Sequence, residues 1–170
     1  MSTISGKRAL ELVLDGHIPP FPPHWELVFQ LEREFFGLDL DGAREADRPA
    51  MQIEIFRRLV DEFGWAAVGA GYDVAAISRV KRALGDQALT VAYEGSGVFW
   101  MPTGGNIMDF VIRLYEQRRE LHAEARRKCE QAKRFFTDAV DAGADFFVLA
   151  YDFGFNDGPF ISPDDFRDLV

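Results

Sequence analysis

The sequence predicts an α/β fold in which short buried strands alternate with helices. Apolar runs at Trp65–Ala70, Ala88–Tyr93 and Phe146–Ala150 have the length and unbroken hydrophobicity of strands covered on both faces. The segments between them carry apolar residues at helical spacing, and this alternation indicates right-handed crossovers and a parallel sheet. An open doubly wound sheet and a (β/α)₈ barrel both fit. The 170 residues would supply about half of a barrel, whose usual length is about 250 residues.

The N-terminal part of the chain begins with a short predicted helix at Arg8–Leu14, which Asp15-Gly16 ends. The run Ile18–Pro23 that follows is rich in proline and cannot be helical, since each proline removes a donor and restrains its neighbour. We expect it to lead into a strand at His24–Phe29, or directly into a helix that runs to Phe36.

The remaining helices follow from the spacing of apolar residues and from end signals. Gly64 and Gly143 stand where a left-handed residue ends a helix. Ser162 predicts the start of a last helix, because Pro163 occupies its first turn and Asp165 lies three residues after the cap. The helices expected between these signals are Ala50–Phe63, Val74–Leu84, Asn106–Tyr115 and Arg118–Ala142.

Composition and charge narrow the class of partner. The formal net charge of −9 disfavours nucleic acid and anionic membrane surfaces, because their phosphates would be repelled. The single cysteine, Cys129, allows no internal disulfide, and neither a signal peptide nor a run of about 20 apolar residues is visible. We therefore expect a cytoplasmic protein that acts on a small-molecule substrate.

Polar residues that follow the expected strands are the candidate site, because parallel α/β folds bind ligands at the carboxyl ends of their strands. A half-buried carboxylate there can hold N–H donors or handle a proton, so Asp73 and Asp152 are the candidate catalytic residues. Helix capping by Asp73 and turn stabilisation by Asp152 explain the same residues about equally well. The candidate substrate-binding residues are His24, Glu26, Tyr72, Glu94, Ser96 and Asn156.

Other patterns argue against resident cofactors. The turn that begins at Gly69 lies between a strand and a helix, as in a dinucleotide site, but Val74 replaces the third glycine. Cys129 is expected to be a buried structural cysteine on the apolar side of its helix. No set of three close ligands for zinc is present, so we expect no metal and no cofactor in this chain.

The chain resembles the uroporphyrinogen decarboxylase superfamily, which includes the decarboxylase of haem synthesis and the corrinoid-linked methyltransferases. The most specific resemblance is a block formed by Ala142–Asp145, an apolar strand, Tyr151-Asp152 and Gly158–Phe166, which is similar to the family pattern GAD…D…SPE-x-F. Two earlier segments also resemble the family: Phe63–Asp73, and Gly85-Asp86 with the strand and glycine-rich loop that follow it. The resemblance spans most of the chain.

This resemblance implies that residues 1–170 are a single domain, the N-terminal half of a (β/α)₈ TIM barrel truncated at its C-terminus, with Asp73 and Asp152 in the barrel mouth. The decarboxylase signature RQAGRY should follow Pro23, but His24-Trp25-Glu26 stands there without an arginine to bind substrate carboxylates. The methyltransferase branch is therefore favoured, which implies methyl transfer from a corrinoid or a methylated small molecule to a thiol. In that branch zinc activates the thiol, and its His-x-Cys and Cys ligands are expected only in a full-length form.

Two alternatives remain open. The first is uroporphyrinogen decarboxylation, in which Asp73 would hold the pyrrole nitrogens of a tetrapyrrole. The second is a non-catalytic half-barrel that binds or pairs with another subunit. Four strands would leave two open edges, so a half-barrel is expected to form a homodimer or to pair with its missing C-terminal half.

Overall fold

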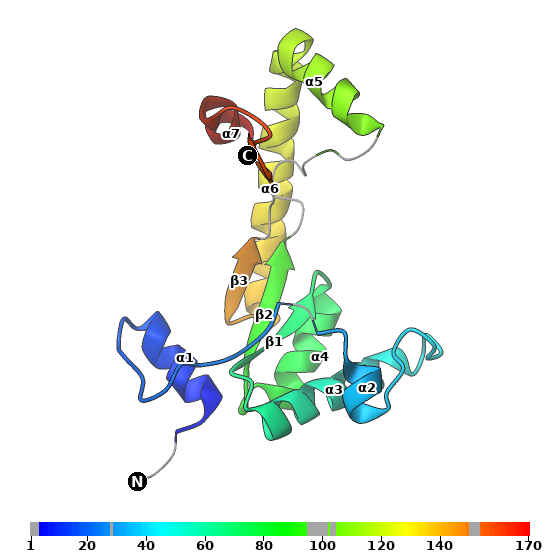
Figure 1. Cartoon of the computed structure of the whole chain (residues 1–170), viewed down its shortest axis with the longest axis vertical. Helices are drawn as coiled ribbons and strands as arrows, with labels where there is room; N and C mark the ends of the chain where they lie inside the picture. The colour runs from blue at the N-terminus through cyan, green and yellow to red at the C-terminus, as the bar shows by residue number, and fades with distance from the viewer. Residues whose placement is uncertain (1–3, 28, 95–101, 103–104, 150–153) are drawn as a thin grey trace. The chain divides into compact units, whose positions relative to one another are not determined.

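The computed structural model describes residues 4–27, 29–94, 102, 105–149 and 154–170, and only the backbone of Glu94. It is a mixed α/β structure, and none of its described helices has the length and apolar character needed to cross a bilayer (Figure 1). The elements are α1 (Gly6–Leu14), α2 (Glu32–Phe36), α3 (Arg48–Phe63), β1 (Ala67–Gly71), α4 (Val74–Leu84), β2 (Leu89–Glu94), α5 (Asn106–Glu116), α6 (Arg118–Asp141), β3 (Phe146–Leu149), β4 (Gly154–Phe155), β5 (Gly158–Pro159) and α7 (Pro163–Leu169).

Three strands form a sheet in the order β1-β2-β3, and β1 runs parallel to β2 (Figure 1). Ala67 lies opposite Leu89, and the register shifts by one residue so that Gly71 lies opposite Ala92. The parallel α/β class predicted from the sequence is therefore confirmed. The three strands lie within one or two residues of the predicted apolar runs.

The strand expected at His24–Phe29 is wrong for the part that the structure describes, because residues 24–27 and 29 have no strand pairing. Ala66 N–H donates to the carbonyl of His24 at 2.8 Å, but no ladder follows from it. The prolines before His24 explain the difference, since they deliver an extended chain without the successive donors that a ladder needs. The alternative helix to Phe36 is present only as the short α2.

The chain divides into two compact units, and unit 1 comprises residues 1–92 and 139–147. Its helices α3 and α4 contact each other, and α4 also contacts β1. The α3 helix ends at Gly64, whose φ of +67° confirms the left-handed ending that the sequence predicts. The largest fully buried side chains of this unit are Leu59, Val68, Ile77, Val80, Leu84, Thr90 and Val91.

Asp145 joins three elements of unit 1. Its carboxylate accepts from the Lys81 ammonium at 2.7 and 2.8 Å and from the Thr90 backbone N–H at 2.8 Å. Its own N–H donates to the Thr90 carbonyl, also at 2.8 Å. Just before it, Gly143 has a φ of +101°, and a Cβ at that position would lie 2.5 Å from Lys81 Cγ. The Gly143–Asp145 segment thus fixes where β3 begins.

Unit 2 comprises residues 93–138 and 148–170. Its core brings α5, α6 and α7 together through the buried side chains of Phe110, Leu114, Leu121, Ala125, Ile161 and Leu169. The antiparallel pair of β4 and β5 was not predicted, because two-residue strands give no detectable alternation. Cys129 is partly exposed rather than buried, which corrects the expectation for that residue. Leu121, Ala125, Ala132 and Ala139 on the same helix are buried.

Candidate functional site

Asp73 follows β1 and is the N-cap of α4. Its two carboxylate oxygens accept from the backbone N–H groups of Ala75 at 3.2 Å and Ala76 at 3.0 Å. The side chain is 67% exposed, and Arg79 lies 3.9 Å away as a weak ion pair. Tyr72 beside it is 59% exposed. The capping role considered from the sequence is therefore present, and the carboxylate remains open to water at the end of β1.

The other residues expected at strand ends are described only in part. Asp152 and Ser96 lie outside the described residues. Glu94 is the last residue of β2, and its side chain also lies outside them. Asn156 is exposed in the turn between β4 and β5 in unit 2. Asp73 and Tyr72 thus lie just after the end of β1, and the Asp73 side chain is more exposed than the half-buried carboxylate that the sequence analysis expects.

His24 and Glu26 are brought together beside a cavity in unit 1. His24 Nε2 lies 3.8 Å from Glu26 Oε1, and both side chains are more than half exposed. The cavity has a volume of about 460 Å³ and is lined by these two residues and by four aromatic rings. The rings belong to Phe29, Phe35, Phe63 and Trp65.

The four rings form a continuous series of contacts around this cavity. Phe29 meets Trp65 nearly at a right angle, with centroids 5.8 Å apart, and Phe35 meets Phe63 in the same way at 5.6 Å. Phe29 and Phe35 connect the two pairs at 6.3 Å. Such edge-to-face pairs are favourable beyond their buried area. The rings are therefore held against one another at the surface of the unit.

A second cavity of about 420 Å³ shares His24, Phe63 and Trp65 with the first and extends to Ser5 and Phe21. His24 also meets Trp65 edge-on, with ring centroids 6.1 Å apart. The imidazole therefore stands where the two cavities adjoin. Because Trp65 is only 4% exposed, it gives both cavities a fixed wall.

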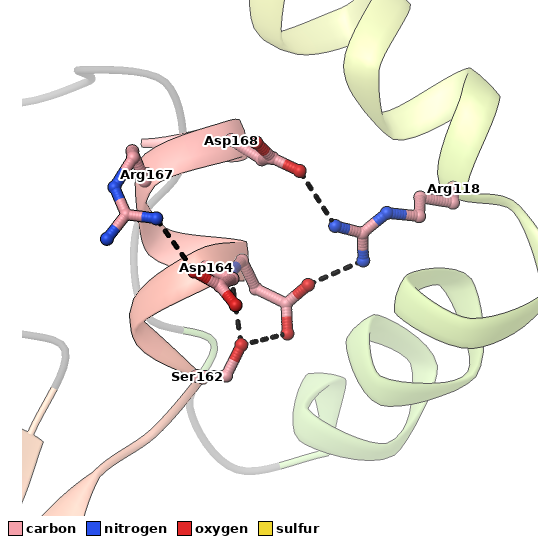
Figure 2. Close-up of polar contacts among 6 residues, drawn as sticks. Arg118, Ser162, Asp164, Arg167 and Asp168 are labelled. Atoms are coloured by element: carbon pink, nitrogen blue, oxygen red, sulfur yellow. Dashed lines mark hydrogen bonds and ion pairs between the residues drawn. The ribbon is translucent and has the colours of Figure 1, made fainter.

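Unit 2 contains a polar network centred on Arg118. Figure 2 shows its guanidinium directed at α7, where it donates to the carboxylates of Asp165 and of Asp168, the latter at 3.0 Å. The Ser162 hydroxyl also donates to Asp165 at 2.7 Å. The Ser162 hydrogen bond, followed by the bond from Arg118, holds the pKa of Asp165 below its ordinary value.

Glu124 shows the same balance between burial and pairing. Burial raises the pKa of its carboxyl, but the hydrogen bond from Arg113 at 2.6 Å and the charge of Lys128 outweigh burial and leave the pKa lowered. These acidic groups of unit 2 are ionised and matched by cations. Their arrangement explains the packing of the helices and supplies no general base.

The described residues do not fit a zinc ion. Within the ranges that the structure describes, no three histidine, cysteine or acidic side chains are grouped closely enough to hold a metal.

Comparison with protein-family models, with curated proteins and with solved structures finds no match for this chain.

The aromatic cavity was missed by sequence reasoning, although His24 and Glu26 were selected. The sequence predicts Trp65 in a strand and Phe63 at the end of a helix, and it leaves Phe29 in either a strand or a helix that runs to Phe36. A usable signal was present, because four aromatic residues flank the helix ends at Gly37 and Gly64: Phe35, Phe36, Phe63 and Trp65. Partly exposed aromatic residues at two adjacent helix ends indicate a shared surface rather than a core.

Proposed function

We propose that this chain belongs to a cytoplasmic enzyme of the uroporphyrinogen decarboxylase superfamily that transfers a methyl group from a corrinoid or another methylated small molecule to a thiol. The proposal rests on the sequence resemblance and on the fold that accompanies it. The Arg-poor segment after Pro23 favours methyl transfer over porphyrinogen decarboxylation, because a tetrapyrrole with several carboxylates needs cationic partners.

The strand order supports a barrel as the parent fold. In the sheet, sequence neighbours are spatial neighbours in the order β1-β2-β3. A (β/α)₈ barrel has this order throughout, whereas the flavodoxin-like sheet has the order 2-1-3 at its start. One half of a Rossmann sheet has the same sequential order, but the turn after β1 lacks the third glycine of the dinucleotide fingerprint.

The observation that carries the proposal is the physical fit of the most family-like block. Gly143 takes a left-handed conformation, Asp145 joins β3 to β2 and α4, and Ser162 caps α7 by accepting from Asp165 N–H at 3.1 Å. These residues thus stand at the end of a helix, at the start of a strand and at the start of a helix, and this placement is compatible with the family-like block.

In this proposal Asp73 acts at the carboxyl end of β1. A carboxylate offers about four acceptor sites, and capping α4 uses two of them. The remaining lone pairs face water and can orient a polar group of the substrate or receive the thiol proton. In the transfer, the thiolate sulfur forms a bond to the methyl carbon while the donor keeps the electron pair of the broken bond.

The experiment is an assay of the purified full-length protein with ¹³C-methyl-labelled methylcobalamin and a thiol, followed by carbon NMR. A new S-methyl signal that depends on the protein supports methyl transfer. Parallel incubation with uroporphyrinogen, with detection of released carbon dioxide, distinguishes the decarboxylase. Failure of both reactions under conditions where the protein is folded would contradict the proposal.

A further inference from the structure

We propose that the aromatic cavity of unit 1 binds a small methylated ammonium cation, with Glu26 as its counter-charge. The aromatic cavity is the space of about 460 Å³ that is lined by four aromatic rings and four other side chains: Phe29, Phe35, Phe63, Trp65, His24, Glu26, Gln30 and Leu31. This inference goes beyond the proposed function and holds whether or not the chain transfers methyl groups.

The ring geometry provides the π surfaces that such a cation needs. In a perpendicular pair, the ring that contributes its edge keeps both of its own faces clear of its partner. The cavity has two such pairs, Phe29 with Trp65 and Phe35 with Phe63. Neighbouring centroids are about 6 Å apart, so a cation that lies between two neighbouring rings comes within cation–π range of both.

The charge of the lining selects a cation over an anion. Glu26 contributes a carboxylate to the rim, and no lysine or arginine is among the described residues that line the cavity. The π faces are negative, so they repel an anion as the carboxylate does. The formal net charge of −9 adds a long-range attraction for cations.

The chemistry of the walls selects a methylated ammonium over a bare one. A primary ammonium carries three N–H donors, and the aromatic part of the wall cannot replace the water that those donors lose, so only Glu26, Gln30 and His24 could accept from them. Methyl groups on the nitrogen need no hydrogen bonds, and they spread the positive charge over a surface that contacts rings directly. The volume falls within the range of small-molecule sites and leaves room for a polar tail.

The same aromatic cluster already holds a cation of the protein. The guanidinium of Arg58 lies 5.0 Å from the ring centroid of Phe36, and Phe36 lies 5.9 Å from Phe29. Arg58 itself is paired with Glu62 at 2.9 Å. The neighbouring face of the cluster is thus occupied by a cation with a carboxylate beside it, which is the arrangement we infer for the cavity.

The test compares choline with 3,3-dimethylbutanol, an uncharged molecule of nearly the same shape, by calorimetric titration at mildly alkaline pH. We expect measurable binding of choline and much weaker binding of the alcohol. The variant Phe35→Leu should weaken choline by about twofold to thirtyfold, which is the range of a cation–π contact. Phe35 is 58% exposed, so this substitution leaves the fold intact.

Matched variants make the outcome decisive. Phe166→Leu removes a similarly exposed phenylalanine from unit 2 and should leave choline binding unchanged. Glu26→Gln should weaken the binding of choline about twofold to fivefold and leave the binding of the alcohol unchanged. An exposed ion pair contributes little more than this to affinity. Equal binding of choline and the alcohol, or no binding of either, would overturn the proposal. An equal loss of choline affinity in Phe35→Leu and Phe166→Leu would also overturn the proposal.

Discussion

Asp73 combines a capping role with a charge that stays accessible at the end of a strand. Its carboxylate holds the first N–H groups of α4, and two thirds of the side chain remains in contact with solvent. Asparagine caps helices about as well as aspartate, whereas alanine does not. The two roles can therefore be separated by substitution.

We expect Asp73→Ala to lower the free energy of unfolding by about 1 kcal/mol, because two backbone donors of α4 lose their acceptor. Asp73→Asn keeps one acceptor oxygen for these two donors, so it should lower the free energy of unfolding much less than Asp73→Ala does. Urea denaturation followed by circular dichroism measures both. Equal losses in the two variants would show that the charge, and not the cap, stabilises this position.

Replacing Asp145 should lower the free energy of unfolding more than replacing an exposed carboxylate does. Asp145→Ala leaves the backbone N–H of the fully buried Thr90 without its acceptor, so we expect a loss of about 2 kcal/mol. Lys81→Met removes the ion pair but keeps that hydrogen bond, and it should cost about 0.5 kcal/mol. If Lys81→Met proved as damaging as Asp145→Ala, the ion pair would be the dominant contribution.

Among single residues, local signals were predictable and long-range ones were not. The caps at Asp73 and Ser162 and the left-handed Gly143 depend on a few neighbouring residues, so the sequence indicates them. The contact of Asp145 with Lys81 spans 64 positions in the chain. Such a contact becomes visible only when the strand order is known.

At the scale of elements, helices with strong apolar periodicity were predicted almost to the residue, and α4 matches its expected bounds. The structure of the segment that begins at His24 was not predicted correctly, because its aromatic residues fit a strand and a surface cluster equally well. Proline before it removes donors but does not show where the chain goes next. The aromatic cavity was not predicted for the same reason.

The attachment of α7 should depend on pH through Asp165. Its carboxyl pKa in the folded state is lowered from the ordinary 3.8, first by the Ser162 hydroxyl and then by Arg118. A lowered pKa stabilises the fold fully above the ordinary value, and this contribution is lost as pH falls through the folded pKa. Stability should therefore decline in acid below about pH 4, the ordinary range of a carboxyl.

Carbon NMR titration of the Asp165 carboxyl measures this directly. Ser162→Ala should raise its pKa toward the ordinary value, and Arg118→Gln should raise it as well. Arg167→Gln is the control, because Arg167 pairs with Asp164 on the same helix (Figure 2). A titration of Asp165 that is the same in all three variants would contradict the assigned network.

At the scale of the whole molecule, the chain consists of two compact units, and each is formed by two separate segments. Composition and periodicity predicted the α/β class but not this division, because both units draw on the long helix α6 and on neighbouring strands. The division rests on which buried side chains meet, and apolar spacing within one element does not reveal its partners.

A core substitution in unit 2 should report on this division. Leu121 is fully buried in the cluster with Phe110 and Leu169. Leu121→Ala should therefore lower the free energy of unfolding by about 2 to 5 kcal/mol. Hydrogen exchange should show amides of α5 and α7 losing protection while those of α4 keep theirs. An equal loss of protection in all three helices would mean that the units unfold as one.

The most direct test of the proposed function is protein-dependent methyl transfer from labelled methylcobalamin to a thiol, compared between the wild type and Asp73→Asn. The account predicts transfer by the wild type and at least about tenfold slower transfer by Asp73→Asn, within the usual contribution of a proton-transfer group. Because this variant keeps the α4 cap, a loss of rate cannot come from unfolding. Transfer at the same rate in both proteins would contradict the role of Asp73, and no transfer by the wild type would contradict the proposed activity.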